Sequence, residues 1–122
     1  MPYMVLVLEK PGERKHWPAV DAEQRYDRMM AFAAGLREKG ILVAGESLST
    51  DDGIRMRRQG GKVVATDGPF AEAKEIVGGF FLLDCDESDE ALAIAESCPA
   101  AEWSTVELRW VAPCWDGAKL RG

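Results

Sequence analysis

The chain has 122 residues, of which 47% are hydrophobic and 30% are charged, and its 15 basic and 21 acidic side chains give a net charge of −6. This length fits one domain with a single hydrophobic core, and the composition excludes an intrinsically disordered chain. The acidic balance argues against a nucleic-acid partner. No apolar run approaches the ~20 residues of a membrane span, so we expect no membrane contact. Cys85, Cys98 and Cys114 are odd in number and have no C-x-x-C spacing, so we expect reduced thiols and a cytoplasmic protein.

The first third of the sequence predicts a strand, a loop and a long helix. Residues 3–9, "YMVLVLE", form a short apolar run typical of a buried strand, and a loop bounded by Pro and Gly follows at 10–18. Asp21 with Gln24 resembles a capping box, and Gly40 stands where a left-handed C-terminal cap is expected. Between these signals, apolar residues recur at helical spacing and define one face: Ala22, Tyr26, Met29, Met30, Ala33 and Leu36.

The middle of the sequence predicts strands and a hairpin. Residues 41–48, "ILVAGESL", are typical of a strand, and 54–59 and 62–66 flank Gly60-Gly61, a two-glycine loop that suits a primed hairpin turn. Residues 78–86, "GGFFLLDCD", are the most apolar stretch, so we expect a central strand buried on both faces.

A second helix and a last strand complete the pattern. Ser88 can cap the helix, Pro99 ends it, and Leu92, Ala95 and Cys98 are expected to face the core. In residues 104–111, "STVELRWV", apolar Val106, Leu108 and Trp110 alternate with polar positions, as in a half-buried strand.

The order strand, helix, strand, hairpin, strand, helix, strand predicts a ferredoxin-like α+β sandwich, an antiparallel sheet with two helices on one face. The other face would carry too many apolar side chains, from "GGFFLLD" and "VELRW", to stay in water. We therefore expect a homodimer that buries this face. A single domain would occupy residues 1–122, with a loosely held tail at 113–122.

The stretch at 61–75, "GKVVATDGPFAEAKE", places charged residues around a rigid corner. Pro69 fixes its own φ, Gly68 tolerates strained backbone, and Asp67 can accept hydrogen bonds from freed N–H groups, so the corner can be purely structural. Asp67 can equally be a catalytic carboxylate, and Phe70 can either plug the core or contact a ligand.

Glu72 and Glu75 would share one face of a helical turn. If both point into a cleft, their repulsion raises the pKa of one and yields an acid beside a base; if exposed, they are solvated. Lys74 could hold an anionic group or pair with Asp84, and Glu46 adds a further carboxylate. The spacing matches no calcium loop or nucleotide fingerprint, so we expect neither a metal nor another cofactor.

Four stretches together resemble the YCII-related family, in the branch named for its Asp-Gly-Pro-Phe motif. They are "ESL" at 46–48, the corner stretch at 61–75, "GGFFLLD" at 78–84 and "DEALAIA" at 89–95. The resemblance implies a dimeric α/β barrel in which two ferredoxin-like subunits pack sheet to sheet. It also implies a small-molecule-handling protein, although most members have no established reaction.

The resemblance further implies an acid–base pair in other members, a His on the first helix with an Asp on a core strand. Those positions fall on Met29 and roughly on Asp84 here, so the mechanism does not transfer, because Met29 cannot move a proton. Many genes of this branch lie beside extracytoplasmic-function sigma factors, which implies a regulatory context.

Two functional hypotheses follow. In the first, the protein binds or converts a small polar metabolite of unknown identity in a cleft lined by the corner. Its catalytic candidates would be Asp67, Glu72, Glu75 and Asp84, and its ligand-binding candidates Glu46, Lys74 and Phe70. In the second, it is a non-catalytic regulatory module. His16 lies in a polar loop and is expected at the surface, and without a second His the three cysteines are not expected to be nucleophiles.

Overall fold

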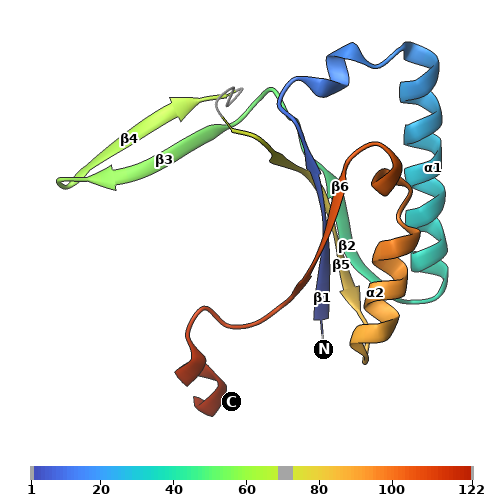
Figure 1. The fold of residues 1–122 in the computed structure, drawn as a ribbon. Coiled ribbons are helices and arrows are strands. Elements are labelled where there is room, and N and C mark those ends of the chain that lie inside the picture. Colours follow the sequence, from blue (N-terminus) through green and yellow to red (C-terminus); the bar gives the residue numbers. More distant parts are fainter. Residues whose placement is uncertain (1, 69–72, 122) are drawn as a thin grey trace.

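The computed structural model describes residues 2–68 and 73–121, which form an antiparallel sheet with two α-helices on one face (Figure 1). Four strands lie in the order β2-β5-β1-β6. The elements of this body are β1 (Pro2–Glu9), α1 (Ala19–Glu38), β2 (Leu42–Ser47), β5 (Ile76–Asp84), α2 (Ser88–Ser97) and β6 (Thr105–Trp110). The predicted ferredoxin-like α+β sandwich is confirmed.

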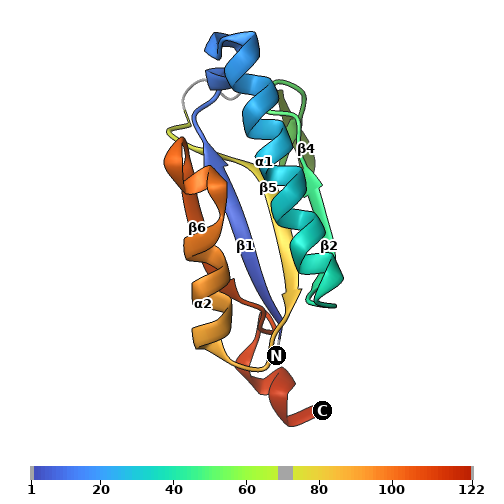
Figure 2. The same ribbon diagram turned by 90° about the vertical axis from the view of Figure 1, so that its right-hand side faces the viewer.

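The core lies between the sheet and the two helices, which run side by side over it in Figure 2. β5 lies between β2 and β1, so its predicted central position is confirmed. The buried apolar side chains on the helix side of the sheet include Tyr3, Val5, Val7, Phe81 and Leu83. They pack against Ala33 and Leu36 of α1 and Ala91 and Ala95 of α2. None of the helices in the described part of the chain is long and apolar enough to span a membrane.

Both helices begin differently from the sequence prediction. α1 begins at Ala19 behind Pro18, so Asp21 lies in its first turn and makes no capping box. Pro18 already fixes the entry of the chain because its ring restricts φ. α2 begins at Ser88, with Glu87 in the N-cap position and no side-chain cap. The predicted left-handed glycine after α1 is confirmed, since Gly40 has φ of +71°.

The apolar faces of the helices were predicted only in part. Tyr26 and Met30 are mostly exposed rather than packed in the core, because they line a cavity beside the sheet. Leu92 is also exposed, and Ala91 takes its place in the core of α2. A small residue there lets the helix lie close to the sheet.

The sheet face away from the helices is uncovered within one chain. In the register of β1 with β5, Met4 lies opposite Leu82 and Leu6 lies opposite Phe80 on this face. β6 does not supply the apolar side chains predicted for it. Val106 and Leu108 pack toward the core, while Glu107 lies opposite Leu6 on the uncovered face. The apolar part of this face therefore comes from β1 and β5, and β6 gives it a charged edge.

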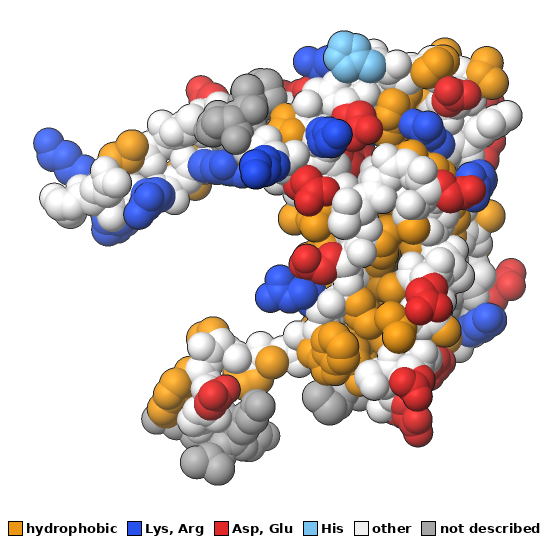
Figure 3. All heavy atoms as spheres, in the orientation of Figure 1, with side chains coloured by type: hydrophobic (Ala, Val, Ile, Leu, Met, Phe, Trp, Pro, Cys, Tyr) orange, Lys and Arg blue, Asp and Glu red, His pale blue; other side chains and the backbone are white. Residues whose placement is uncertain are grey.

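A long hairpin arm projects from the body on the side of the uncovered face (Figure 1). It consists of β3 (Ile54–Gln59) and β4 (Lys62–Asp67), joined at Gly60 and Gly61, whose φ of 55° and 79° fit the predicted primed turn. The chain after β6 leaves on the same side and ends in the 3-10 turn at Asp116–Arg121. Arm, sheet and tail enclose a broad concave surface in Figure 3.

Candidate functional site

The corner predicted from the sequence lies at the base of the arm. The Gly68 N–H donates a hydrogen bond of 2.7 Å to the Gly53 carbonyl and closes this base. Asp67 ends β4 and is exposed, and Lys74 and Glu75 are also exposed just before β5. Phe70 and Glu72 lie outside the described residues.

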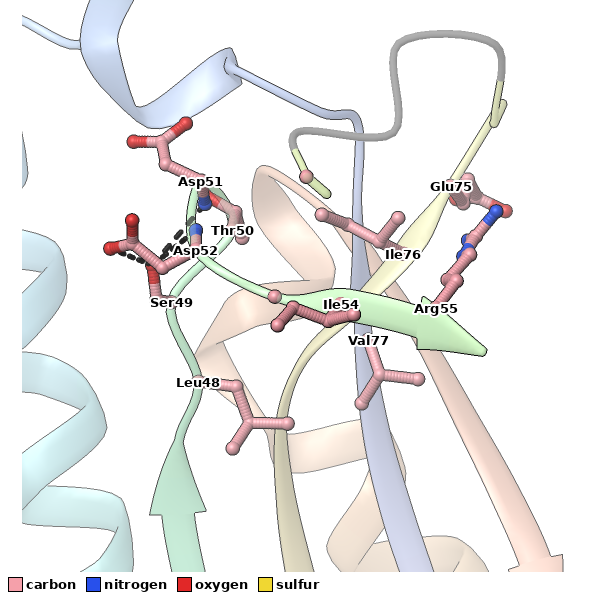
Figure 4. A pocket seen from close by; sticks show the side chains of 12 residues that line it. Leu48, Ser49, Thr50, Asp51, Asp52, Ile54, Arg55, Glu75, Ile76 and Val77 are labelled. Atoms are coloured by element: carbon pink, nitrogen blue, oxygen red, sulfur yellow. Dashed lines mark hydrogen bonds between the residues drawn. The ribbon is translucent and has the colours of Figure 1, made fainter. Parts of the chain in front are cut away.

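A cavity of about 480 Å³ lies where the arm meets the sheet (Figure 4). Its wall is formed by residues 48–55, by Gly68 and by residues 75–77. Ile76 and Val77 give it an apolar floor, and the Arg55 side chain extends from β3 toward Glu75. Ser49 holds the connecting loop, because its hydroxyl oxygen accepts hydrogen bonds from the backbone N–H groups of Asp51 and Asp52. Of the predicted site residues that the structure describes, only Glu75 contributes to this wall.

The structure does not bring Asp84 to the corner. Asp84 ends β5 and lies opposite Pro2, whereas Glu75 directly precedes the first residue of the same strand. A strand rises about 3.3 Å per residue, so nearly the whole length of the sheet separates the two carboxylates. Within one chain, Asp84 therefore pairs with neither Lys74 nor Glu75, and the predicted pairing of Asp84 with Lys74 is wrong there.

A second cavity, of about 470 Å³, lies between α1 and the sheet. Its apolar wall includes Trp17, Tyr26, Met29, Met30, Phe81 and Trp103. Its polar side chains include Glu9, Arg14, Arg25, Arg37, Glu46 and Ser47. A mostly apolar wall with a few convergent polar groups is typical of small-molecule sites, and the volume falls in their usual range of about 300–1,000 Å³.

Glu9 is the central acidic group of this cavity. Glu9 lies at one of the alternating buried positions of β1, and its side chain is only 4% exposed. Its Oε1 accepts a hydrogen bond of 3.2 Å from Arg14 Nε, and its Oε2 lies 2.6 Å from Arg14 Nη2. Arg14 also donates to the carbonyls of Leu48 (3.0 Å) and Gly78 (2.9 Å). One guanidinium thus neutralises the buried carboxylate and fastens two strand ends, which keeps the pair ordered.

Two glycines make room for this arrangement. A Cβ on Gly78 would lie 2.6 Å from Cδ of Glu9 and 2.9 Å from Nη2 of Arg14. A Cβ on Gly79 would lie 3.1 Å from the backbone carbonyl of Glu46 on the neighbouring strand. Close strand packing therefore accounts for Gly79, whereas Gly78 leaves space for a buried carboxylate that the sequence analysis did not single out. The sequence contained a sign of this buried acid, because Glu9 continues the alternation of Tyr3, Val5 and Val7 and therefore falls at a buried position.

Arg25 supplies positive charge to the same cavity. Its guanidinium carbon lies 4.5 Å from the ring centroid of Trp17 and 5.2 Å from that of Trp103. Stacking on aromatic faces orders a guanidinium without using its N–H donors. Among the described residues, no carboxylate forms an ion pair with Arg25. The cavity therefore contains an ordered cation whose hydrogen-bonding edge is available to a ligand.

Two residues singled out from the sequence also line this cavity. Met29 projects from α1, so the position where the resemblance implies a histidine lies in the cavity wall with a thioether in its place. Glu46, on the edge strand β2, is exposed at the same cavity. Glu9 is thus the buried titratable acid here, and Glu46 is a solvated one.

The remaining candidate groups lie elsewhere. His16 is exposed in the 3-10 turn at Glu13–His16 and lines neither cavity. Burial raises the pKa of the Cys98 thiol and, together with the carboxylates of Glu90 and Asp84, that of the Cys85 thiol. Buried thiols with raised pKa values are poor nucleophiles. Over 2–68 and 73–121, no three His, Cys, Asp or Glu side chains are grouped to hold a metal ion.

Comparison with known proteins agrees with the fold and the sequence motif. Residues 1–114 match the YCII-related domain. An uncharacterised protein of Rhizobium meliloti is 32% identical over 106 residues, which cover 86% of each chain. The fold is also similar to that of 5-chloro-2-hydroxyhydroquinone dehydrochlorinase from Burkholderia phenoliruptrix, solved with 2,5-dihydroxybenzoquinone. That structure has a TM-score of 0.50 and 18% identity, and the match covers 93% of this chain and 96% of that one.

Proposed function

The chain belongs to the YCII-related family, and we propose that it binds a small organic anion with an apolar or aromatic body in the cavity between α1 and the sheet. The observation that carries this proposal is the guanidinium of Arg25, which two aromatic rings order and no described carboxylate pairs with, in a wall that also holds the buried Glu9. An anionic group on the ligand would pair with Arg25, and the apolar wall would hold the rest of the molecule.

Glu9 would set the specificity of this site. Arg14 occupies one side of the carboxylate, and a ligand hydroxyl could donate a hydrogen bond to the other. Such a carboxylate favours ligands with a hydroxyl donor, because each of its oxygens can accept a further hydrogen bond beside the one from Arg14. Hydroxylated aromatic acids carry both a hydroxyl donor and an anionic group. A hydroxylated ring also occurs in the quinone bound to the dehydrochlorinase of similar fold.

Chemistry at this site would use Glu9 as its proton acceptor. A carboxylate held within hydrogen-bond reach of a ligand hydroxyl can take up a proton. Met29 cannot assist, so a histidine-dependent mechanism has no counterpart here. We therefore propose a binding site in which Glu9 is the group that accepts a proton from the ligand.

The cavity at the base of the arm is a second candidate for the ligand site. Glu75 lines it, and Asp67 ends the adjoining strand. We retain Asp67, Glu72 and Glu75 as proposed acidic groups of that cavity, with Lys74 and Phe70 as proposed ligand contacts. The loop at 48–55 supplies hydroxyls and carboxylates that could hold the polar groups of a ligand above the apolar floor of Ile76 and Val77.

We also propose that the protein is a homodimer. Met4, Leu6, Phe80 and Leu82 form an apolar stripe on the uncovered sheet face and would pack against the same stripe of a second chain. Sheets pack face to face at a distance of about 10 Å, and a stable interface buries about 1,200–2,000 Å² in total. Such a pair would make the dimeric α/β barrel that the family resemblance implies.

The test is a binding screen with matched variants. Thermal-shift measurements with a panel of hydroxybenzoates and hydroxyquinones identify a ligand, and calorimetry then compares wild type with Glu9→Gln and Arg25→Gln. Both variants should weaken binding at least about tenfold, the cost of one lost charge-assisted hydrogen bond of ~1.5–3 kcal/mol. Glu75→Gln and Asp67→Asn should leave it unchanged. If only Glu75→Gln and Asp67→Asn weaken binding, the ligand site lies at the base of the arm. If no compound binds, the result favours the hypothesis of a non-catalytic regulatory module.

A further inference from the structure

The hairpin arm projects from the body with its two strands exposed to solvent (Figure 1). β3 and β4 pair with each other and form a separate sheet, and none of the body strands that the structure describes lies beside them. All residues of both strands are exposed, including Ile54, Met56 and Val63, which are each more than half exposed. An isolated two-stranded hairpin is at best marginally stable in water. The arm is therefore built to pack against another surface.

The charge of the arm differs from that of the body. Residues 54–67 contain four basic side chains and one acidic side chain, a net charge of +3, and this leaves −9 for the rest of the chain. Figure 3 shows the basic side chains gathered over the arm. At the opposite end of the sheet, residues 84–90, "DCDESDE", contain five acidic side chains and no basic one. This opposite charge favours a second copy of the chain over a nucleic acid.

Symmetry decides where the arm would dock. In a face-to-face pair the two-fold axis runs either along the strands or across them. An axis along the strands would place both arms, each of charge +3, at the same end, where they would repel. An axis across the strands places each arm over the far end of the partner's sheet. That is the end at which β5 reaches Asp84 and α2 begins.

The length of the arm fits this placement. A six-residue strand spans about 20 Å. Packed sheets lie about 10 Å apart, so the arm would extend past the partner's sheet to its helix layer. We propose that the arm of each subunit embraces the second copy, with Arg57 and Arg58 docked on the acidic segment at Asp84–Glu90.

This inference rests on the proposed homodimer and has its own test. Sedimentation equilibrium would measure the dimer dissociation constant of wild type and of Arg57→Glu/Arg58→Glu. Each dimer carries two arms, so the reversed charges should raise this constant about tenfold or more at about 0.1 M salt, and less at about 1 M salt. The matched control, Arg57→Lys/Arg58→Lys, keeps the charge and should dimerise like wild type.

A charge swap identifies the docking partner. Asp86→Lys/Glu87→Lys changes exposed residues before α2 and should weaken the dimer in the same way. Combining it with the reversed arm in one chain should recover most of the lost affinity. Circular dichroism checks that each variant is folded. The inference would be overturned, with the dimer intact, if reversing the arm charges left the dissociation constant unchanged. It would also be overturned if the combined charge swap did not restore dimer affinity. If Arg57→Glu/Arg58→Glu abolished binding to a nucleic acid but left the dimer unchanged, the inference would also be overturned. A monomeric wild type would contradict the homodimer itself.

Discussion

The carboxylate of Glu9 occupies the space that a side chain at Gly78 would need, since a Cβ there would lie 2.6 Å from Cδ of Glu9. The same carboxylate is held by Arg14, which in turn donates to the Gly78 carbonyl. Three residues from β1, the following loop and β5 thus fix one another at the end of the sheet. Gly78, the first glycine of the pair that follows the corner motif, is explained by the acid it accommodates.

Gly78→Ala should destabilise the protein. The new methyl group would displace Glu9 from Arg14, and breaking a largely buried ion pair costs about 2 kcal/mol or more. Chemical denaturation measures the loss. Gly35→Ala is the matched control, because no atom outside its helix lies near that position and alanine favours a helix by up to about 1 kcal/mol. Equal stability of the two variants would refute the steric argument.

Glu9 and Arg14 should be energetically coupled. Glu9→Gln and Arg14→Met should each lower the free energy of unfolding by about 2 kcal/mol, since each leaves the partner charge uncompensated. The double variant should lose clearly less than the sum, with a coupling of about 1 kcal/mol or more in a double-mutant cycle. Additive losses would mean that the two side chains act independently.

A charge on the uncovered sheet face should prevent dimerisation. Leu6 lies opposite Phe80 in the centre of this face, so Leu6→Asp would bury a carboxylate in the proposed interface. Light scattering should then report a monomer. Leu92→Asp, at an exposed position of α2, should leave the dimer unchanged. A Leu6→Asp protein that dimerises like wild type would place the interface elsewhere.

The buried thiols should make stability fall at alkaline pH. Burial raises the pKa of Cys85 and Cys98 in the folded state, so the protonated thiols are favoured by folding. Their contribution is fully present below about pH 8.5, where unfolded thiols begin to ionise, and is lost as the pH rises through the raised folded pKa values. Denaturation between neutral and alkaline pH measures this decline. Cys85→Ala/Cys98→Ala should flatten it; an unchanged decline would assign it to other groups.

Patterns of local sequence were sufficient for most of the fold. Alternation and helical spacing located the strands and helices, and Gly60-Gly61 located the hairpin, because these signals act over a few residues. The β6 side chains were assigned to the wrong face, since an alternating strand does not reveal which of its two faces meets the helices. Leu92 was misplaced for a related reason: the smaller Ala91 lets α2 approach the sheet, and hydrophobicity alone does not report this.

The candidate site was harder to predict from the sequence. Charges close together in the chain drew attention to the corner, where Glu75 is the one described residue of the predicted set that lines the adjacent cavity. The pair formed by Glu9 and Arg14 joins a strand end to a loop. It needs the space left by Gly78, which is distant in sequence. Asp84 was grouped with the corner although the full length of β5 separates them. Such relationships come from the register of the strands.

The most direct test of the proposed ligand site is a titration of the protein labelled at its methionine methyl groups. Met29 and Met30 line the cavity between α1 and the sheet, whereas Met4 lies on the uncovered face and Met56 on the arm. Adding the tightest hydroxybenzoate or hydroxyquinone from the screen should shift the methyl resonances of Met29 and Met30 and leave Met56 in place. Binding that leaves Met29 and Met30 unshifted would contradict a ligand site beside Glu9 and Arg25.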